Sequence, residues 1–314
     1  MSHPAPFTVF GGATVDHAAA TAGPAVMHAS NPGTARSAPG GVGLNVARVL
    51  ARLGHGVRIV SRIGRDTDGE AVRAAARGDG VDAGWISTSP AGRTATYRAA
   101  FGDDGELIIG IADMAVFDEL TPEAVAPAAA AARPGETFVL DANLPAPTLA
   151  FLCDTATGGR RSVAAVGVSP AKAARLAPLL SRIGHLFATR REAAALLGWP
   201  ADPAVPTRDL ARGLVERGAA HAIVTDSANP LAAAAPGEVH LFPPFPARVE
   251  SVNGAGDSLA AGLLHGLADG RGFFDAVLCG LGAAAITLED AATVARGIDP
   301  KALEERIARA RVIT

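Results

Sequence analysis

The chain has few lysines and few cysteines, and each shortage excludes a class of site. Its two lysines are Lys172 and Lys301, and neither follows a glycine. A Walker-type phosphate loop needs a Gly-Lys-Ser/Thr sequence, so P-loop chemistry is excluded. The two cysteines, Cys153 and Cys279, are too few for a disulfide framework or a cysteine-rich zinc site. We expect them to be buried free thiols in a reducing compartment.

Strong charge and long apolar runs are also absent. The formal net charge is −3, which favours neither nucleic acid nor an acidic membrane surface. The apolar run at 278–288 is shorter than the roughly 18 residues of a membrane span and contains two glycines. The first residues lack the basic and apolar regions of a signal peptide. We therefore expect a cytoplasmic protein that binds neither nucleic acid nor membrane.

Short β-type runs alternate with longer helical segments, which is the pattern of βαβ units and a mainly parallel sheet flanked by helices. The expected strands are 7–10, 57–60, 138–140, 162–168 and 222–225, and the expected helices are 44–53, 70–77, 191–197, 207–217, 258–268 and 303–312. The alanine-rich patches 126–132 and 232–235 are interpreted as helix or surface filler.

Two stretches interrupt this alternation. Residues 25–38 are polar and turn-rich, whereas 94–101 and 106–111 are β-type runs around Gly102-Asp103-Asp104-Gly105, a strong hairpin signal. Such a hairpin within an α/β chain predicts a small lid. We expect one domain over 1–314, with a β lid formed by about 14–38 and 92–113.

The segment Gly254-Ala255-Gly256-Asp257 stands directly before an apolar helical run. Glycines there let the backbone present N–H groups at a helix N-terminus, where the helix dipole favours an anion. Asp257 is then a general base that faces a phosphate. The alternative is an ordinary acidic residue that stabilises the helix dipole.

A second glycine cluster, Pro39-Gly40-Gly41-Val42-Gly43-Leu44-Asn45, also precedes a helix. A dinucleotide-binding turn would need G-x-G-x-x-G directly after the first strand, and this cluster lies well beyond it. A close-packed backbone platform, from which the Asn45 amide reaches into a pocket, fits the segment better.

Asp16, the Gly-Gly-x-Gly-x-Asn platform and the late GAGD helix together resemble the ribokinase-like (PfkB) sugar and nucleoside kinases over essentially the whole chain. Within that family, Ser30-Asn31-Pro32-Gly33, PGGVGLNVARVLARLG, Thr94-Ala95-Thr96-Tyr97 and GDDGELIIGIADM look most like bacterial pseudouridine kinases. This closer resemblance covers roughly residues 30–114.

The resemblance implies ATP-dependent phosphorylation of the 5′-hydroxyl of pseudouridine. Asp257 would be the base, and Gly254, Ala255 and Gly256 would form the anion hole. Asp16 would grip the ribose hydroxyls, with Gly41 and Asn45 beneath the sugar; the alternative for Asp16 is a loop acid that caps the strand and turn. Asn31, Thr96 and Asp113 would contact the nucleobase or the ribose. The alternative for these three residues is that they support the turn and the lid.

On the phosphate side, the resemblance implies Asn143, Lys172, Thr225 and Asn253 as binding residues, with Asp141 nearby. Glu192 would order Mg²⁺ through water, although the usual Asn-x-x-Glu motif begins here with Thr189. The alternatives are a solvated helix acid for Glu192 and a surface lysine for Lys172.

Two departures from the family pattern affect the nucleotide side. The usual Gly-x-x-Gly turn is replaced by residues 226–230, which include Pro230, and the acid usually found before GAGD is missing. A requirement for K⁺ therefore does not follow from the resemblance.

The apolar alternate face of the hairpin 94–111 predicts a homodimer formed through the lid. Three other functions remain open. They are phosphorylation of another nucleoside or sugar (a ribokinase or an adenosine kinase), nucleoside binding by a catalytically weak homologue, and, last, a dinucleotide-dependent oxidoreductase.

Overall fold

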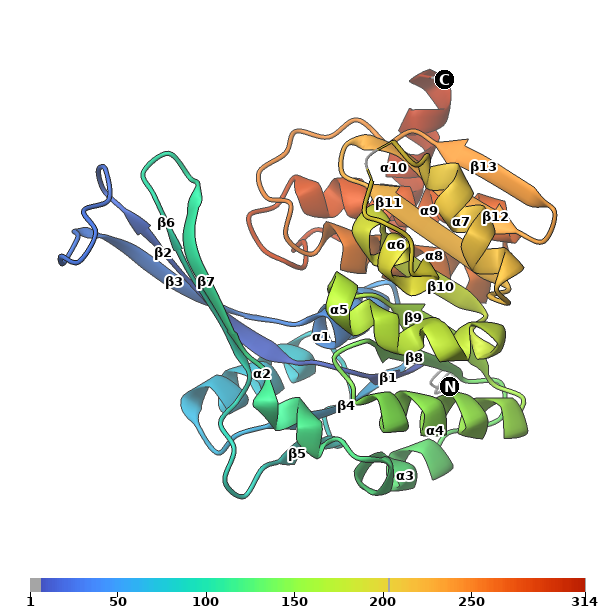
Figure 1. Cartoon of the computed structure of the whole chain (residues 1–314), viewed down its shortest axis with the longest axis horizontal. Coiled ribbons are helices and arrows are strands. Elements are labelled where there is room, and N and C mark those ends of the chain that lie inside the picture. Colours follow the sequence, from blue (N-terminus) through green and yellow to red (C-terminus); the bar gives the residue numbers. More distant parts are fainter. Residues whose placement is uncertain (1–6, 203, 314) are drawn as a thin grey trace.

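A nine-stranded sheet forms the centre of the molecule in a computed structural model that describes residues 7–202 and 204–313 (Figure 1). Its strands are β1 (Phe7–Phe10), β4 (Val57–Ile63), β5 (Ile86–Thr88), β8 (Thr137–Asp141), β9 (Ser162–Val166), β10 (His185–Thr189), β11 (His221–Asp226), β12 (Asn229–Ala235) and β13 (Glu238–Phe242). They lie in the order β13-β12-β11-β10-β9-β8-β1-β4-β5. All pairs from β11 to β5 are parallel, and β12 and β13 add an antiparallel edge.

Helices cover both faces of this sheet. They are α1 (Val42–Arg52), α2 (Thr67–Gly78), α3 (Pro122–Ala130), α4 (Ala146–Gly158), α5 (Pro170–Ala173), α6 (Arg190–Leu197), α7 (Thr207–Glu216), α8 (Ala255–Ala268), α9 (Phe273–Leu288) and α10 (Pro300–Ile313), with 3-10 helices η1 (Ala115–Glu119) and η2 (Ala174–Arg182). One core cluster joins α1, α8 and α9 to one face, and a second joins α3, α4, α6 and α7 to the other. Val9 belongs to the first cluster and Phe10 to the second, so β1 is buried on both sides, as in other parallel sheets. Within the part of the chain that the structure describes, no helix is long and apolar enough to cross a membrane.

The expected α/β architecture is confirmed, and each strand and helix predicted from the sequence overlaps one that the structure contains. The interpretation of 232–235 as helix or surface filler is wrong. These residues belong to β12, where Ala232, Ala233 and Ala234 are fully buried between β11 and β13. The packing of the sheet overrides the weak intrinsic preference of alanine for helix.

A second, four-stranded sheet projects from the first, with α2 at its base (Figure 1). This lid sheet consists of β2 (Thr14–Thr21), β3 (Gly33–Gly40), β6 (Thr96–Phe101) and β7 (Leu107–Asp113), in the order β3-β2-β6-β7. The predicted hairpin is β6 and β7. The stretch 14–38, assigned to the lid from the sequence, contains β2 and most of β3, and the chain between these two strands is turn-rich. Nearly all of β3 is exposed, so no alternation of apolar residues marks it in the sequence.

The strand pairing assigns the residues of the lid sheet to two faces. Asp16 lies opposite Tyr97, and Tyr97 opposite Ala112, so these three share one face. Thr96 precedes Tyr97 in β6 and Asp113 follows Ala112 in β7. These two residues lie opposite each other and therefore point to the other face of the sheet. We call the side of the sheet that carries Asp16 the Asp16 face. The other side carries His17, the next residue along β2, and we call it the His17 face.

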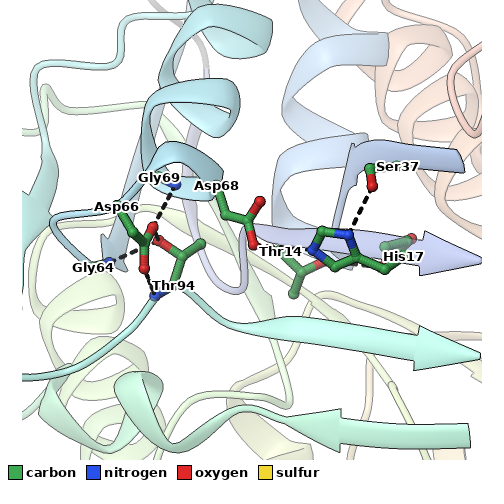
Figure 2. A network of polar contacts seen from close by, with 9 residues as sticks. Thr14, His17, Ser37, Gly64, Asp66, Asp68, Gly69 and Thr94 are labelled. Atoms are coloured by element: carbon green, nitrogen blue, oxygen red, sulfur yellow. Dashed lines mark hydrogen bonds and ion pairs between the residues drawn. The ribbon is translucent and has the colours of Figure 1, made fainter.

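Helix α2 holds the His17 face at the base of the lid sheet. Figure 2 shows His17 between Ser37 of β3 and Asp68 of α2. Its Nδ1 lies 2.7 Å from Ser37 Oγ and its Nε2 lies 3.0 Å from Asp68 Oδ2. Nearby, Asp66 caps the N-terminus of α2 and also accepts a hydrogen bond from Thr94 N at 2.9 Å. These contacts join the base of the lid sheet to α2.

Candidate functional site

Helix α8 begins with backbone N–H groups that no side chain caps. Gly254 is the N-cap residue with φ +78°, and a Cβ there would overlap the carbonyl oxygen of Thr293, so only glycine fits. By contrast, a Cβ on Gly256 would meet nothing within 4 Å. The exposed Asn253 stands just before this turn. The first turn of α8 therefore offers both free N–H groups and the helix dipole to an anion.

Asp257 lies in this first turn and is partly exposed. Its Oδ2 accepts a hydrogen bond from Asn45 Nδ2, at the start of α1, at 2.8 Å. Desolvation raises the pKa of Asp257 to about 7, against the effect of that hydrogen bond, and the charges of Asp141, Asp16 and Glu192 add to the rise. A carboxyl that titrates near neutral pH is suited to taking up a proton.

The glycine platform presents Asn45 to the same place. Gly41 has φ +97°, and a Cβ on it would stand 2.7 Å from the carbonyl oxygen of Gly12, so this position requires glycine. Asn45 is only 5% exposed, and its Oδ1 has no hydrogen-bond partner among the residues that the structure describes. A buried acceptor without a donor is rare, and a ligand hydroxyl would satisfy it.

Asp141 holds this platform in position. Its Oδ2 accepts hydrogen bonds from Gly12 N at 2.7 Å and Gly43 N at 2.9 Å, and its Oδ1 accepts one from Asn143 N at 2.9 Å. Burial raises the pKa of Asp141, and these hydrogen bonds act against the rise. The carboxylate thus ties the end of β1 to the N-terminus of α1. It is a positioning residue for the platform.

Lys172 and Asn143 form a pair beside Asp141. Lys172 Nζ donates to Asn143 Oδ1 at 2.6 Å. Desolvation lowers the pKa of Lys172, while the charge of Asp141 raises it. Lys172 is partly buried, so the alternative of a freely solvated surface lysine does not describe it.

Glu192 is 7% exposed, which excludes the solvated helix acid that the sequence left open. Its Oε2 accepts a hydrogen bond from Thr189 N at 2.9 Å, and Thr189 Oγ1 accepts one from Glu192 N at 3.4 Å. Thr189, which replaces the asparagine of the family motif, thereby forms a capping box at the start of α6. Burial raises the pKa of Glu192.

Thr225 lies near the end of β11, opposite Thr189 in the register of β10 and β11. Beyond it the chain turns sharply into β12 through Ser227, which has φ +53°. Asn229 Nδ2 donates to Asp226 Oδ2 across this turn at 3.2 Å. A compact hairpin turn therefore stands where the family pattern has Gly-x-x-Gly.

Asp16 lies within β2, so it is not the loop acid that the sequence left open. Thr14 Oγ1 donates to its Oδ1 at 3.2 Å, and a Cβ on Gly40 would stand 2.5 Å from its Oδ2. Burial raises the pKa of Asp16. Its charge also raises the pKa of Asp257, so the Asp16 and Asp257 carboxyl groups lie near each other.

The other lid residues singled out from the sequence are not brought to Asp16. Thr96 and Asp113 line a pocket of about 350 Å³ on the His17 face, on the opposite side of the sheet. Asn31 accepts a hydrogen bond from Val26 N at 2.8 Å and donates one to Val26 O at 2.9 Å, so its amide closes the loop between β2 and β3. The turn-supporting alternative describes Asn31 in this structure.

Sequence reasoning missed the neighbour of Asp16 on β6, which is Tyr97. The alternation of side chains along a strand would have found it, given the register between β2 and β6. That register is parallel and joins strands about 80 residues apart, and no local pattern in the sequence discloses it.

Comparison with known families agrees with these features. The family model described as pfkB family carbohydrate kinase matches residues 7–298. Among curated proteins, the pseudouridine kinase of Escherichia coli (strain K12) is 27% identical over 260 residues, which are 82% of this chain and 82% of that protein.

Solved structures extend the comparison to the whole fold. A carbohydrate kinase from Agrobacterium tumefaciens is 34% identical, with a TM-score of 0.83 over 96% of both chains. A ribokinase from Arabidopsis thaliana, complexed with ribose and ATP, is 19% identical, with a TM-score of 0.81 over 97% of this chain and 99% of that one. The expected ribokinase-like fold is therefore confirmed.

Proposed function

Because the chain belongs to the PfkB family of carbohydrate kinases, and is thus a phosphotransferase that acts on a hydroxyl group, we propose that it transfers a phosphoryl group from ATP to the 5′-hydroxyl of pseudouridine. The observation that carries this proposal is the Asp257 carboxyl, with its pKa raised to about 7, beside the uncapped N-terminus of α8. Phosphoryl transfer needs a base for the attacking hydroxyl and donors for the transferred charge, and this turn supplies both.

In the proposed reaction, ionised Asp257 accepts the proton of the 5′-hydroxyl while that oxygen bonds to the terminal phosphorus of ATP. The bond from this phosphorus to its bridging oxygen breaks, and ADP leaves with that oxygen. The N–H groups of Ala255 and Gly256 donate to the phosphoryl oxygens, where the helix dipole stabilises the developing charge. Gly254 keeps the turn in the conformation that aims these groups.

The ribose is held from the other side. Asp16 accepts hydrogen bonds from the two neighbouring ribose hydroxyls, and the unpaired Asn45 Oδ1 accepts one from the sugar. Asn45 Nδ2 donates a hydrogen bond to Asp257, so Asn45 links sugar binding to the orientation of the general base. Gly41 has no side chain, so the sugar can lie directly against the backbone there.

A divalent cation fits the charges around Asp257. The carboxylates of Asp141, Asp16 and Glu192 all raise its pKa, so the region is strongly negative and favours Mg²⁺ with its own water ligands. Glu192 would hold such a water, and the ion neutralises the phosphates of ATP when bound. Asn143, Lys172, Thr225 and Asn253 would line the nucleotide side of the proposed site. K⁺ is not part of the proposal, because the acid expected before Gly254 is absent.

Support for pseudouridine in particular comes from the E. coli relative and from the matching segments within residues 30–114. A substrate panel tests it: pseudouridine, uridine, adenosine, cytidine, ribose and fructose with ATP and Mg²⁺, with ADP measured and Asp257→Asn as the blank. We expect kcat/KM for pseudouridine to exceed that for uridine by about tenfold to a hundredfold, the effect of an acceptor for the extra ring N–H of pseudouridine. Equal efficiency on both would contradict pseudouridine specificity, and activity on ribose alone would favour a ribokinase.

The lid sheet supports a homodimer. Ile109 and Ile111 of β7 lie on the His17 face and are 55% and 56% exposed, so α2 does not cover them. Two such faces would cover each other's exposed apolar side chains. The solution mass tests this part of the proposal, with Ile109→Lys/Ile111→Lys as the disrupting variant; an active monomer of wild-type chain would contradict it.

A further inference from the structure

On the Asp16 face, one row of the lid sheet lies level with Asp16. Across the four strands this row is Ala38, Asp16, Tyr97 and Ala112. The next row toward the tip is Arg36, Ala18, Ala99 and Gly110. Tyr97, the single tyrosine of the chain, is therefore the aromatic side chain next to Asp16, among residues that are mostly alanine and glycine.

Gly110 accounts for the way in which the Tyr97 ring lies. A Cβ on Gly110 would stand 2.5 Å from Tyr97 Oη and 3.2 Å from its Cζ. The ring thus extends diagonally across β7 and occupies the space that a side chain at position 110 would need. Tyr97 is nevertheless 36% exposed. The ring therefore lies against β7 at Gly110 and remains partly accessible to solvent.

The distance from Asp16 suits a nucleoside. Neighbouring strands are about 4.8 Å apart, so the backbone of Tyr97 lies one strand spacing from that of Asp16, and the Tyr97 ring extends from there over β7. In a nucleoside the base is attached to the carbon next to the one that carries the 2′-hydroxyl. A planar base directed toward β6 would lie over the adjacent strand, where a free sugar has only a hydroxyl.

We propose that Tyr97, lying on Gly110, is the platform on which the planar base of the substrate stacks, and that it selects nucleosides over free sugars. This inference rests on the proposed kinase function, with Asp16 on the ribose. It replaces Thr96 and Asp113 as the base contacts, because their side chains lie on the His17 face. Every nucleobase has a π-face, so the platform selects the class of substrate, and other groups distinguish pseudouridine from uridine.

The test compares nucleosides with ribose in four proteins: wild type, Tyr97→Phe, Tyr97→Leu and Gly110→Ala. Loss of a base–aromatic stack corresponds to about tenfold to a hundredfold in affinity, so Tyr97→Leu should raise KM for pseudouridine and uridine alike by that factor. The kcat should change little, and KM for ribose should stay the same. Tyr97→Phe should keep KM near wild type, and Gly110→Ala, which displaces the ring, should behave like Tyr97→Leu.

Calorimetric titration with pseudouridine in the absence of ATP gives the same comparison without catalysis, and the solution mass of each variant is measured beside it. Unchanged nucleoside binding in Tyr97→Leu would overturn the platform, as would an equal loss for ribose or a change of oligomeric state. Failure of the kinase proposal looks different: wild-type protein then phosphorylates no nucleoside, whatever the residue at position 97.

Discussion

The N-terminus of α8 and the lid sheet contribute to the proposed site from opposite kinds of structure. Helix α8 packs closely on α9: a Cβ on Gly262 would stand 2.6 Å from the carbonyl oxygen of Cys279, and one on Gly280 would stand 2.7 Å from that of Leu259. The lid sheet has little behind it, and β7 is exposed along its whole length. Elements with few buried contacts open and move most easily.

This difference suggests a division of work. The proposed reacting groups belong to a helix end that the core fixes, which suits a geometry that must hold to a fraction of an ångström. The groups proposed to select the substrate belong to a sheet with few buried contacts, which suits an element that opens to admit the substrate. Substitutions at the start of α8 should then act on kcat, and substitutions on the lid sheet should act on KM.

The largest effect is expected for Asp257→Asn. Loss of the general base should lower kcat by about 10²–10⁴, with KM for pseudouridine little changed. The amide retains a partner in Asn45, so the variant should fold. Steady-state kinetics measure kcat and KM, and calorimetric titration measures the binding of pseudouridine. Turnover near that of wild type would remove Asp257 from the proposed mechanism.

The two glycines of the same turn should respond differently to alanine. Gly256→Ala has open space for its methyl group, so it should fold normally. In the proposed mechanism the phosphoryl group approaches through this open space, and the methyl group would obstruct it. We expect kcat to fall on the order of 10², as for a lost oxyanion-hole donor. Gly254→Ala should instead lower the melting temperature, since its φ of +78° and the Thr293 carbonyl both oppose a side chain. Thermal unfolding and kcat of both variants separate a binding role from a structural one.

The same contrast limits what the sequence discloses. Gly254, Asp257 and the helix after them are contiguous, so their residue types and spacing were enough to predict a glycine turn at the start of a helix. Their role as anion hole and base stays a prediction. The lid sheet depends on the pairing of distant strands. Its hairpin, marked by the turn from Gly102 to Gly105, could be predicted strand by strand. Residues 14–38 could be assigned only to the lid as a whole, without β3 or the pairing of β2 with β6.

The histidines illustrate the same limit. No close pairing of histidines is visible in the sequence, yet His55 Nε2 lies 2.8 Å from His265 Nδ1, and the rings of His185 and His221 stack with centroids 4.8 Å apart. Desolvation lowers the pKa of His55 to about 4. These pairs arise where α8 packs against the turn before β4 and where β10 lies beside β11. Such contacts are set by the tertiary fold, and no local motif announces them.

The pH dependence tests whether Asp257 works as its surroundings suggest. Since the pKa of Asp257 is raised to about 7, kcat/KM should fall below that pH and approach a tenfold loss for each pH unit. The residual activity of Asp257→Asn should lack this inflection. A flat wild-type profile between pH 5.5 and about 8 would contradict a base of this pKa.

The same shift predicts the sign of a stability effect. In the unfolded chain an aspartate titrates near 3.8, so folding is favoured by protonated Asp257 and stability is lost as pH rises from about 4 to about 7. Asp257→Asn does not titrate. Its melting temperature should therefore exceed that of wild type by more at pH 8 than at pH 5, measured without ligands. His55 acts in the opposite direction, but equally in both proteins, and cancels in the difference.

The smallest effect is expected on the His17 face of the lid sheet. Asp113→Asn and Thr96→Val alter side chains that lie across the sheet from Asp16 and Tyr97. If substrate selection belongs to the Asp16 face, KM for pseudouridine should change by less than about threefold, equivalent to about 0.6 kcal/mol, because the buried Thr96 and the exposed Asp113 both lie on the opposite face. Tyr97→Leu is the matched variant on the other face, one residue from Thr96. Should Asp113→Asn raise KM as much as Tyr97→Leu does, the base is bound from the His17 face. A second subunit would then have to deliver that face to the site, because the sheet of one chain cannot turn both faces to one nucleoside.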